Sequence, residues 1–238
     1  MVHYAAFVLV FIGQVLIHLV CCGEVPAYQI NSLEYLFNST HGEDWYWYSD
    51  YTVYGTPWNF TKANGISVNP CTETWQGITC SANCSTSEIC NVSAVVLEGY
   101  NLVGPIPPQL GELHTLEKLS FYVNSLTGSI PTELSQLTSV SYLDVGSNSL
   151  TGSVPAELAD LAALETLWVD TNQYSGGIPT SFGNFKSLSL LGMGSCCLVG
   201  SIPTELAQLS TLQYLSLHGN LFTGTTIPQA AQPDKHRY

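Results

Sequence analysis

Short segments in which apolar and polar residues alternate recur at a constant interval through the second half of the chain. In "LETLWVD" the apolar residues Leu164, Leu167 and Val169 are separated by residues such as Thr166 and Trp168. This alternation predicts a short strand that points its apolar side chains inward. Each segment is followed by a glycine and then by Ile-Pro or Val-Pro, and these dipeptides are 24 residues apart. The pattern therefore predicts one strand for every coil of the chain.

Six copies of the frame L-x-x-L-x-L-x-x-N-x-L-x-G-x-I-P occupy residues 92–228. A single coil cannot bury its apolar edge, so stacked coils must share one core and align their strands in a parallel sheet. The glycine of each copy marks a backbone turn, and the proline ends strand pairing on the far side. The frame resembles the plant-type leucine-rich repeat. This resemblance implies an α/β repeat solenoid, a right-handed superhelix with a concave parallel sheet.

One column of the repeat carries asparagine in most copies and cysteine in one. Asparagine at this position satisfies backbone groups of adjoining turns, and a small buried cysteine is a known alternative. We therefore expect a structural ladder formed by Asn124, Asn148, Asn172, Cys196 and Asn220. The adjacent Cys197 has no assigned state, because consecutive Cα atoms lie about 3.8 Å apart, too close for an unstrained disulfide with Cys196. Two adjacent thiols also fall short of a metal site.

Residues 24–91 must cover the first open edge of the solenoid. Apolar residues at helical spacing (Ile30, Leu33, Leu36 and Phe37) predict a helix at its start. The later stretch "PCTETWQGITC" resembles the N-terminal cap of plant-type leucine-rich repeat proteins, which implies a disulfide between Cys71 and Cys80. Cys84 and Cys90 are expected to form a local second bridge, one of 15 connectivities open to six cysteines. The aromatic residues of the cap pack its interior or form a sugar platform.

The N-terminus and the glycosylation motifs indicate an extracellular protein. An apolar run from Ala5 to Val20 is typical of a signal peptide, here residues 1–23, with an uncleaved signal anchor as the alternative. The acceptor motif Asn-x-Ser/Thr occurs at Asn38, Asn59, Asn83 and Asn91, all of them in the cap. We expect secretion to the cell wall or the cell surface, with residues 229–238 forming a polar C-terminal tail.

The charge of the chain restricts its partners. Five Lys and Arg residues stand against 18 Asp and Glu residues, a formal net charge of −13. This balance excludes a basic patch for nucleic acid or for an anionic membrane, and it leaves basic proteins, neutral glycans and cations. No cofactor and no metal site are expected, and beyond the signal segment no membrane span is expected.

The concave sheet is the predicted binding surface, because its outward positions collect aromatic and acidic side chains. Gly192 and Gly194 are expected to leave a bare strip between aromatic rings. Such a surface suits an extended peptide or a glycan, and the alternative is an ordinary solvated sheet whose aromatics suit strands. The candidate ligand-binding residues are Tyr122, Tyr142, Asp144, Trp168, Asp170, Tyr214 and His218.

Two arrangements suggest catalysis, and both fail on geometry. Ser195, His218 and Asp170 contain the residue types of a triad, but Ser195 lies on the coil between the other two. Asp144 and Asp170 lie on adjacent coils, but an open concave sheet is a poor cleft for paired carboxylates. The sequence therefore favours a binding protein over an enzyme.

The interpretation that fits best is a secreted leucine-rich repeat protein that binds a protein or glycan on its concave face. The resemblance extends to polygalacturonase-inhibiting proteins, which implies inhibition of a cell-wall hydrolase as one specific form of this function. It also extends to receptor-like proteins and kinase ectodomains, so the alternatives are a receptor ectodomain or its fragment in signalling, and a structural cell-wall protein. The partner is a protein, basic in one version, or a glycan.

Overall fold

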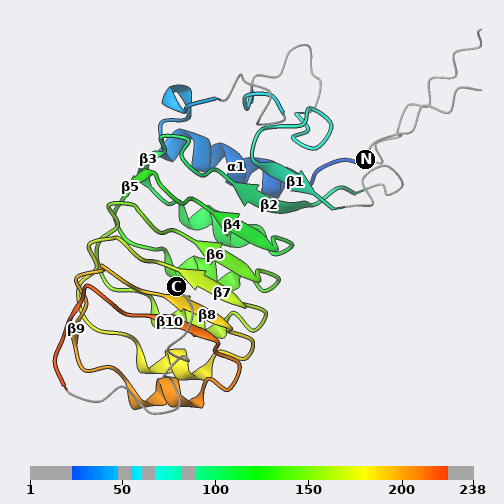
Figure 1. Ribbon diagram of the computed structural model, residues 1–238. Coiled ribbons are helices and arrows are strands. Elements are labelled where there is room, and N and C mark those ends of the chain that lie inside the picture. The colour runs from blue at the N-terminus through cyan, green and yellow to red at the C-terminus, as the bar shows by residue number, and fades with distance from the viewer. Residues whose placement is uncertain (1–22, 48–54, 61–67, 82–88, 225–238) are drawn as a thin grey trace, which may run out of the picture.

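The computed structural model describes residues 23–47, 55–60, 68–81 and 89–224 of the chain (Figure 1). Several expectations from the sequence concern residues outside these ranges. They are the signal segment before residue 23, Cys84, Asn83, the end of the sixth repeat and the C-terminal tail at 229–238.

The cap begins with helix α1 (Ala27–Ser39), which starts directly after Pro26. The helix buries Leu33 and Leu36 completely, as its apolar spacing predicts, and a 3₁₀ helix, η1 (Gly42–Asp44), follows it. Strand β1 (Ile78–Cys80) pairs antiparallel with β2 (Val92–Val96), the first strand of the repeats. Figure 1 shows α1 and β1 lying across the first coil at one end of the solenoid. The cap therefore covers both the apolar edge and the strand edge of that coil.

Aromatic packing fills the cap. Trp45, Trp58 and Trp75 are buried, and the rings of Trp58 and Trp75 stack with centroids 5.5 Å apart. The indole Nε1 of Trp58 donates a hydrogen bond to the Gln76 carbonyl at 2.7 Å. Cys71 and Cys80 form a disulfide with Cα atoms 5.8 Å apart. These tryptophans serve packing rather than a sugar platform.

One sheet of seven strands forms the concave face (Figure 1). From β2 to β10 every pair of neighbours is parallel, and residues separated by 24 positions, such as Tyr142 and Thr166, lie opposite each other. This register follows from the constant repeat length. The strands after β2 are β4 (Lys118–Ser120), β6 (Tyr142–Asp144), β7 (Thr166–Trp168), β8 (Leu190–Gly192) and β10 (Tyr214–Ser216).

Two smaller parallel sheets lie farther along the coils, beyond the turns that end the concave strands. They pair β3 (Val103–Pro105) with β5 (Ser125–Thr127), and β9 (Val199–Gly200) with β11 (Leu221–Phe222). The expected glycine turns follow a backbone requirement: Gly176 and Gly200 both have φ of 82°, although a side chain there would meet open space. The need at these positions is for positive φ, which glycine adopts without strain.

The helices of the repeats are 3₁₀ rather than α. Each begins directly after the proline of the Ile-Pro or Val-Pro dipeptide. A 3₁₀ helix rises about 2.0 Å per residue against about 1.5 Å for an α-helix, so five residues cross more of the convex side. The helices are η2 (Pro108–Glu112), η3 (Thr132–Gln136), η4 (Ala156–Asp160), η5 (Thr180–Asn184) and η6 (Thr204–Gln208).

The asparagine column joins successive coils. Asn148 donates from Nδ2 to the carbonyls of Phe121 (3.0 Å), Val145 (3.2 Å) and Gly146 (3.0 Å), and its Oδ1 accepts the Leu126 N–H at 2.9 Å. All four partners are backbone groups that need a hydrogen bond, and each would lose one if an apolar side chain replaced the amide. The fold is therefore held between coils by side-chain amides as well as by apolar contacts.

Cys196 occupies the same column and uses the same acceptors. Its thiol lies 3.2 Å from the Val169 carbonyl and 3.3 Å from the Gly194 carbonyl, which are the equivalents of two Asn148 acceptors. The residue is fully buried, and burial raises the pKa of the thiol to about 12. Cys197 is exposed and has a φ of 61°. The Cys-Cys pair is thus one buried structural thiol beside one free surface thiol.

Candidate ligand-binding surface

Three rows of side chains cross the concave sheet, each taking one residue from every coil after the first. They follow from the strand register, in which residues 24 positions apart are neighbours. The first row contains Lys118, Tyr142, Thr166, Leu190 and Tyr214, the second contains Ser120, Asp144, Trp168, Gly192 and Ser216, and the third contains Tyr122, Gly146, Asp170, Gly194 and His218. All seven candidate residues from the sequence lie in these rows.

The expected bare strip at the two glycines is wrong, because aromatic rings cover both of them. A Cβ atom added to Gly192 would overlap the Trp168 ring, and one added to Gly194 would overlap the His218 ring. The Trp168 ring also meets Tyr214, with centroids 5.7 Å apart. Each glycine therefore leaves room for a side chain from the neighbouring coil: Trp168 lies over Gly192, and His218 lies over Gly194. The result is a continuous aromatic surface across β7, β8 and β10.

The two acidic candidates differ in access to solvent. Asp144 is 6% exposed, and its carboxylate accepts hydrogen bonds from the Gly146 N–H (2.9 Å) and the Tyr142 hydroxyl (3.1 Å). Asp170 is only half-buried. A Cβ atom on Gly146 would lie 3.2 Å from Asp144 Oδ1 and 2.9 Å from Asp170 Oδ1, so the two carboxylates converge on that glycine. A ligand on the sheet would contact Asp170 directly. It would interact with the buried carboxylate of Asp144 electrostatically rather than by direct contact.

Burial changes the acidity of this cluster. The pKa of Asp144 is raised from 3.8 to about 6, mainly by burial and to a smaller extent by the negative charges of Asp170 and Glu98, against the two hydrogen bonds that lower it. The pKa of Tyr142 is also raised, first by burial and then by the charge of Asp144. A cation placed above the cluster would favour the ionised carboxylate. The site thus matches a positively charged group in a partner.

Two further polar pairs lie at the ends of the surface. Lys118 places its Nζ 4.5 Å from the centroid of the Tyr142 ring, a cation–π contact that holds both side chains. At the other end, Ser216 Oγ and His218 Nδ1 are hydrogen-bonded at 2.8 Å. The side-chain partner of His218 is Ser216, an outward residue of the same coil, whereas the triad considered from the sequence contained Ser195. The period-two strand pattern contained the signal, since residues two apart on a strand share a face.

The remaining candidate residues divide by exposure. Tyr122 and Tyr214 are 41% and 47% exposed, so both rings are open to a partner.

Among the expected glycosylation sites, Asn38 and Asn59 are exposed, and Asn91 is half-buried with its Oδ1 accepting from Gln29 Nε2 at 3.1 Å. Within the described ranges no group of three or more His, Cys, Asp or Glu side chains is arranged to hold a metal ion. The helices in those same ranges are too short or too polar to cross a membrane.

Comparisons with known proteins agree with the repeat architecture. The family model of the leucine-rich repeat matches residues 115–137. Among solved structures, the ectodomain of the receptor kinase GASSHO1/SCHENGEN3 from Arabidopsis thaliana, in complex with CASPARIAN STRIP INTEGRITY FACTOR 2, is 37% identical with a TM-score of 0.61. The alignment covers 68% of this chain and 18% of that one. A comparison with curated proteins finds no match.

Two other Arabidopsis structures extend this similarity. The ectodomain of the receptor kinase HAESA, in complex with an N-terminally extended IDA peptide hormone ligand, is 37% identical over 68% of this chain and 26% of that one, with a TM-score of 0.61. A chain of the BIR3–SERK2 complex is 25% identical over 85% of this chain and 99% of that one, with a TM-score of 0.65. The chain therefore spans a small part of the first two relatives and nearly the whole of the third.

Stacked coils, a concave parallel sheet and a disulfide-bonded cap define a leucine-rich repeat solenoid. The chain belongs to the plant-type extracellular leucine-rich repeat proteins, and its relatives of known structure are ectodomains of plant receptor kinases.

Proposed function

We propose that the chain is an extracellular binding protein that holds an extended peptide, or an extended segment of a protein, along the concave sheet. The observation that carries this proposal is the aromatic surface of Trp168 and Tyr214 beside the half-buried carboxylate of Asp170. Large rings bury apolar area at low entropic cost, and the carboxylate adds selectivity for a basic group. Binding rather than catalysis is the role that an open sheet supports.

The similar structures favour a peptide over a glycan. The HAESA ectodomain was solved with a peptide hormone ligand. The proposed partner of this chain carries Lys or Arg, because the net charge is −13 and the carboxylates of Asp144 and Asp170 converge on the sheet. Inhibition of a cell-wall hydrolase is a narrower form of the proposal, in which the bound segment belongs to the enzyme.

A role as receptor ectodomain in signalling is the second candidate. It is favoured by the match to a chain of the BIR3–SERK2 complex, which this chain covers almost completely. In this version the concave ligand is part of a larger assembly at the cell surface. A purely structural wall protein would need no selective concave surface.

The test is a peptide array probed with the secreted protein. The wild type should retain peptides that combine Lys or Arg with apolar residues, and added salt should weaken the binding. Trp168→Ala should lose about 2 kcal/mol, or about 30-fold in affinity, because large rings dominate interface energies. Asp170→Asn should reduce the preference for basic peptides.

A matched control is Tyr35→Ala, since Tyr35 is 52% exposed on α1 and lies away from the concave sheet. It should bind as the wild type does. Equal binding of all peptides by wild type and Trp168→Ala would contradict the concave site. Retention of no peptide by the wild type would favour the structural role.

A further inference from the structure

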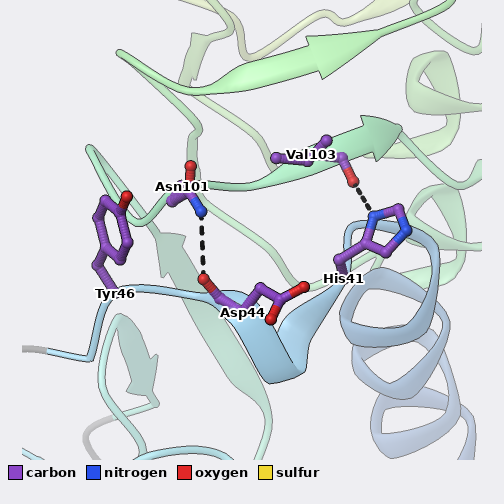
Figure 2. Close-up of a pocket in the computed structure, with 5 residues that line it drawn as sticks. All are labelled: His41, Asp44, Tyr46, Asn101 and Val103. Atoms are coloured by element: carbon purple, nitrogen blue, oxygen red, sulfur yellow. Dashed lines mark hydrogen bonds between the residues drawn. The ribbon is translucent and has the colours of Figure 1, made fainter.

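A pocket lies where the cap meets the first coil, and none of the concave candidates lines it. It has a volume of about 530 Å³ and is lined by His41, Asp44, Tyr46, Asn101 and Val103 (Figure 2). Pockets of a few hundred Å³ hold small organic ligands. Among the described residues that line it, Tyr46 presents an aromatic ring that is 64% exposed.

Hydrogen bonds between the cap and the first coil hold this pocket in shape. Asn101 Nδ2 donates to the Asp44 carbonyl at 3.2 Å, and the Tyr46 N–H donates to the Tyr100 carbonyl at 2.8 Å. His41 Nδ1 lies 2.8 Å from the Val103 carbonyl. The walls therefore come from two parts of the chain that are fixed to each other before any ligand arrives, which lowers the entropic cost of binding.

The polar groups that remain in the pocket are mainly acceptors. A carbonyl can only accept, so His41 Nδ1 carries the proton toward Val103, and Nε2 of the neutral ring is an acceptor. The Asp44 carboxylate accepts only, and the Asn101 amide uses its nitrogen toward Asp44 and presents its oxygen as an acceptor. Several acceptors around one cavity match a ligand that is rich in hydroxyl donors.

The aromatic residue and the charge narrow the ligand class further. Figure 2 shows Tyr46 at one end of the pocket and His41 at the other, with Asp44 and Asn101 between them. An exposed ring offers a flat apolar surface to the C–H face of a pyranose. None of the described lining residues is Lys or Arg, and Asp44 would repel an anion. We infer that this pocket binds a neutral pyranose sugar, with its ring on Tyr46 and its hydroxyls donating to Asp44, Asn101 and His41.

The test is saturation-transfer NMR on the secreted chain with methyl glucoside, methyl xyloside and N-acetylglucosamine as probes. Galacturonate serves as the anionic comparison and N-acetyl-lysine as the cationic one. At least one neutral sugar should give a signal at a concentration of about 10 mM or below, as weak single-sugar sites do. The absence of signal from all three, or a signal from N-acetyl-lysine alone, would overturn the inference.

The variants are chosen so that the fold survives. Asn101 has a φ of 62°, which glycine adopts without strain, so Asn101→Gly removes the amide and keeps the backbone. Tyr46→Ala removes an exposed ring. Each should reduce the sugar signal by about fivefold or more, since each removes one of few direct contacts. The control Tyr35→Ala should keep it, and an unchanged signal in Tyr46→Ala would overturn the proposed pose.

The chain's own glycans are the other source of a neutral pyranose, because the acceptor motif at Asn38 lies three residues before His41. The measurement is therefore made with N-linked sugars intact and after enzymatic trimming. A signal in both states shows that the pocket takes a free sugar, and a signal after trimming alone shows that it holds the chain's own glycan. This experiment is independent of the concave ligand, since Trp168→Ala should leave the sugar signal unchanged.

Discussion

The ring of Trp168 lies over Gly192 on the neighbouring strand. In this position the ring also contacts Tyr214, one strand farther on. Because Gly192 has no side chain, the large side chain of Trp168 can lie across strand β8. The aromatic surface depends on the absence of one Cβ atom.

Replacing Gly192 by alanine should displace Trp168. We expect the indole N–H resonance of Trp168 to shift and the free energy of unfolding to fall by about 1 kcal/mol, since an added methyl group overpacks the contact and the ring can move toward solvent. Leu190→Ala, on the same strand, is the control and should leave the indole resonance in place. An unmoved resonance in Gly192→Ala would show that the ring does not rest there.

Two substitutions of Asn148 should distinguish the contribution of its hydrogen bonds to stability from the contribution of its volume. Asn148→Leu leaves backbone groups without partners and should cost about 1–3 kcal/mol in the free energy of unfolding. Asn148→Cys should cost less, because the Cys196 thiol reaches two equivalent carbonyls in its own coil position. Urea unfolding of both variants is the measurement. Equal losses, or no loss, would argue against the hydrogen-bonding role of this column.

Tyr174 has a buried hydroxyl without a hydrogen-bond partner among the described residues. The side chain is 2% exposed, and burial raises its pKa. Tyr174→Phe should therefore stabilise the protein by about 1 kcal/mol, because it removes a desolvated polar group and keeps the ring. Thermal unfolding is the measurement. A lower midpoint in the phenylalanine variant would reveal a partner for the hydroxyl, such as a buried water.

Asp144 should make the stability of the protein depend on pH. Its pKa is raised from 3.8 to about 6, so the folded state binds more protons than the unfolded state between these values. The associated stability is fully present below pH 3.8 and is lost as the pH rises through about 6. Asp144→Asn should thus gain about 1 kcal/mol over the wild type at pH 7.5 and nothing at low pH. The measurement is the free energy of unfolding of both proteins at pH 7.5 and at low pH. The same difference between the two proteins at both pH values would contradict this prediction.

The neighbouring thiols should differ sharply in reactivity. Iodoacetamide should label exposed Cys197 in the native protein and reach Cys196 only after unfolding, because Cys196 is fully buried and its pKa is raised to about 12. Peptide mapping by mass spectrometry distinguishes the two sites, and Cys197→Ser is the control that should abolish native labelling. Native labelling of Cys196 would contradict its place in the core.

The sequence by itself determined the repeat and everything that is local to one coil. The inward positions Leu164, Leu167 and Val169, the glycine turns and the column of Asn148 and Cys196 follow from a short period that each coil repeats. These features need no knowledge of neighbouring side chains. Apolar residues at helical spacing likewise predicted the cap helix. The resemblance of the cap to known caps predicted the pairing of Cys71 with Cys80.

Tertiary structure decided what the surfaces look like, because side-chain positions depend on neighbours a full coil or more away in sequence. The ring of Trp168 occupies the space that Gly192 leaves, and Asp144 is buried by the side chains around it, so its pKa is raised. The pocket between Tyr46 and Asn101 joins segments about 55 residues apart in the chain. Periodicity fixes which way a side chain faces, and only packing between coils fixes what it meets there.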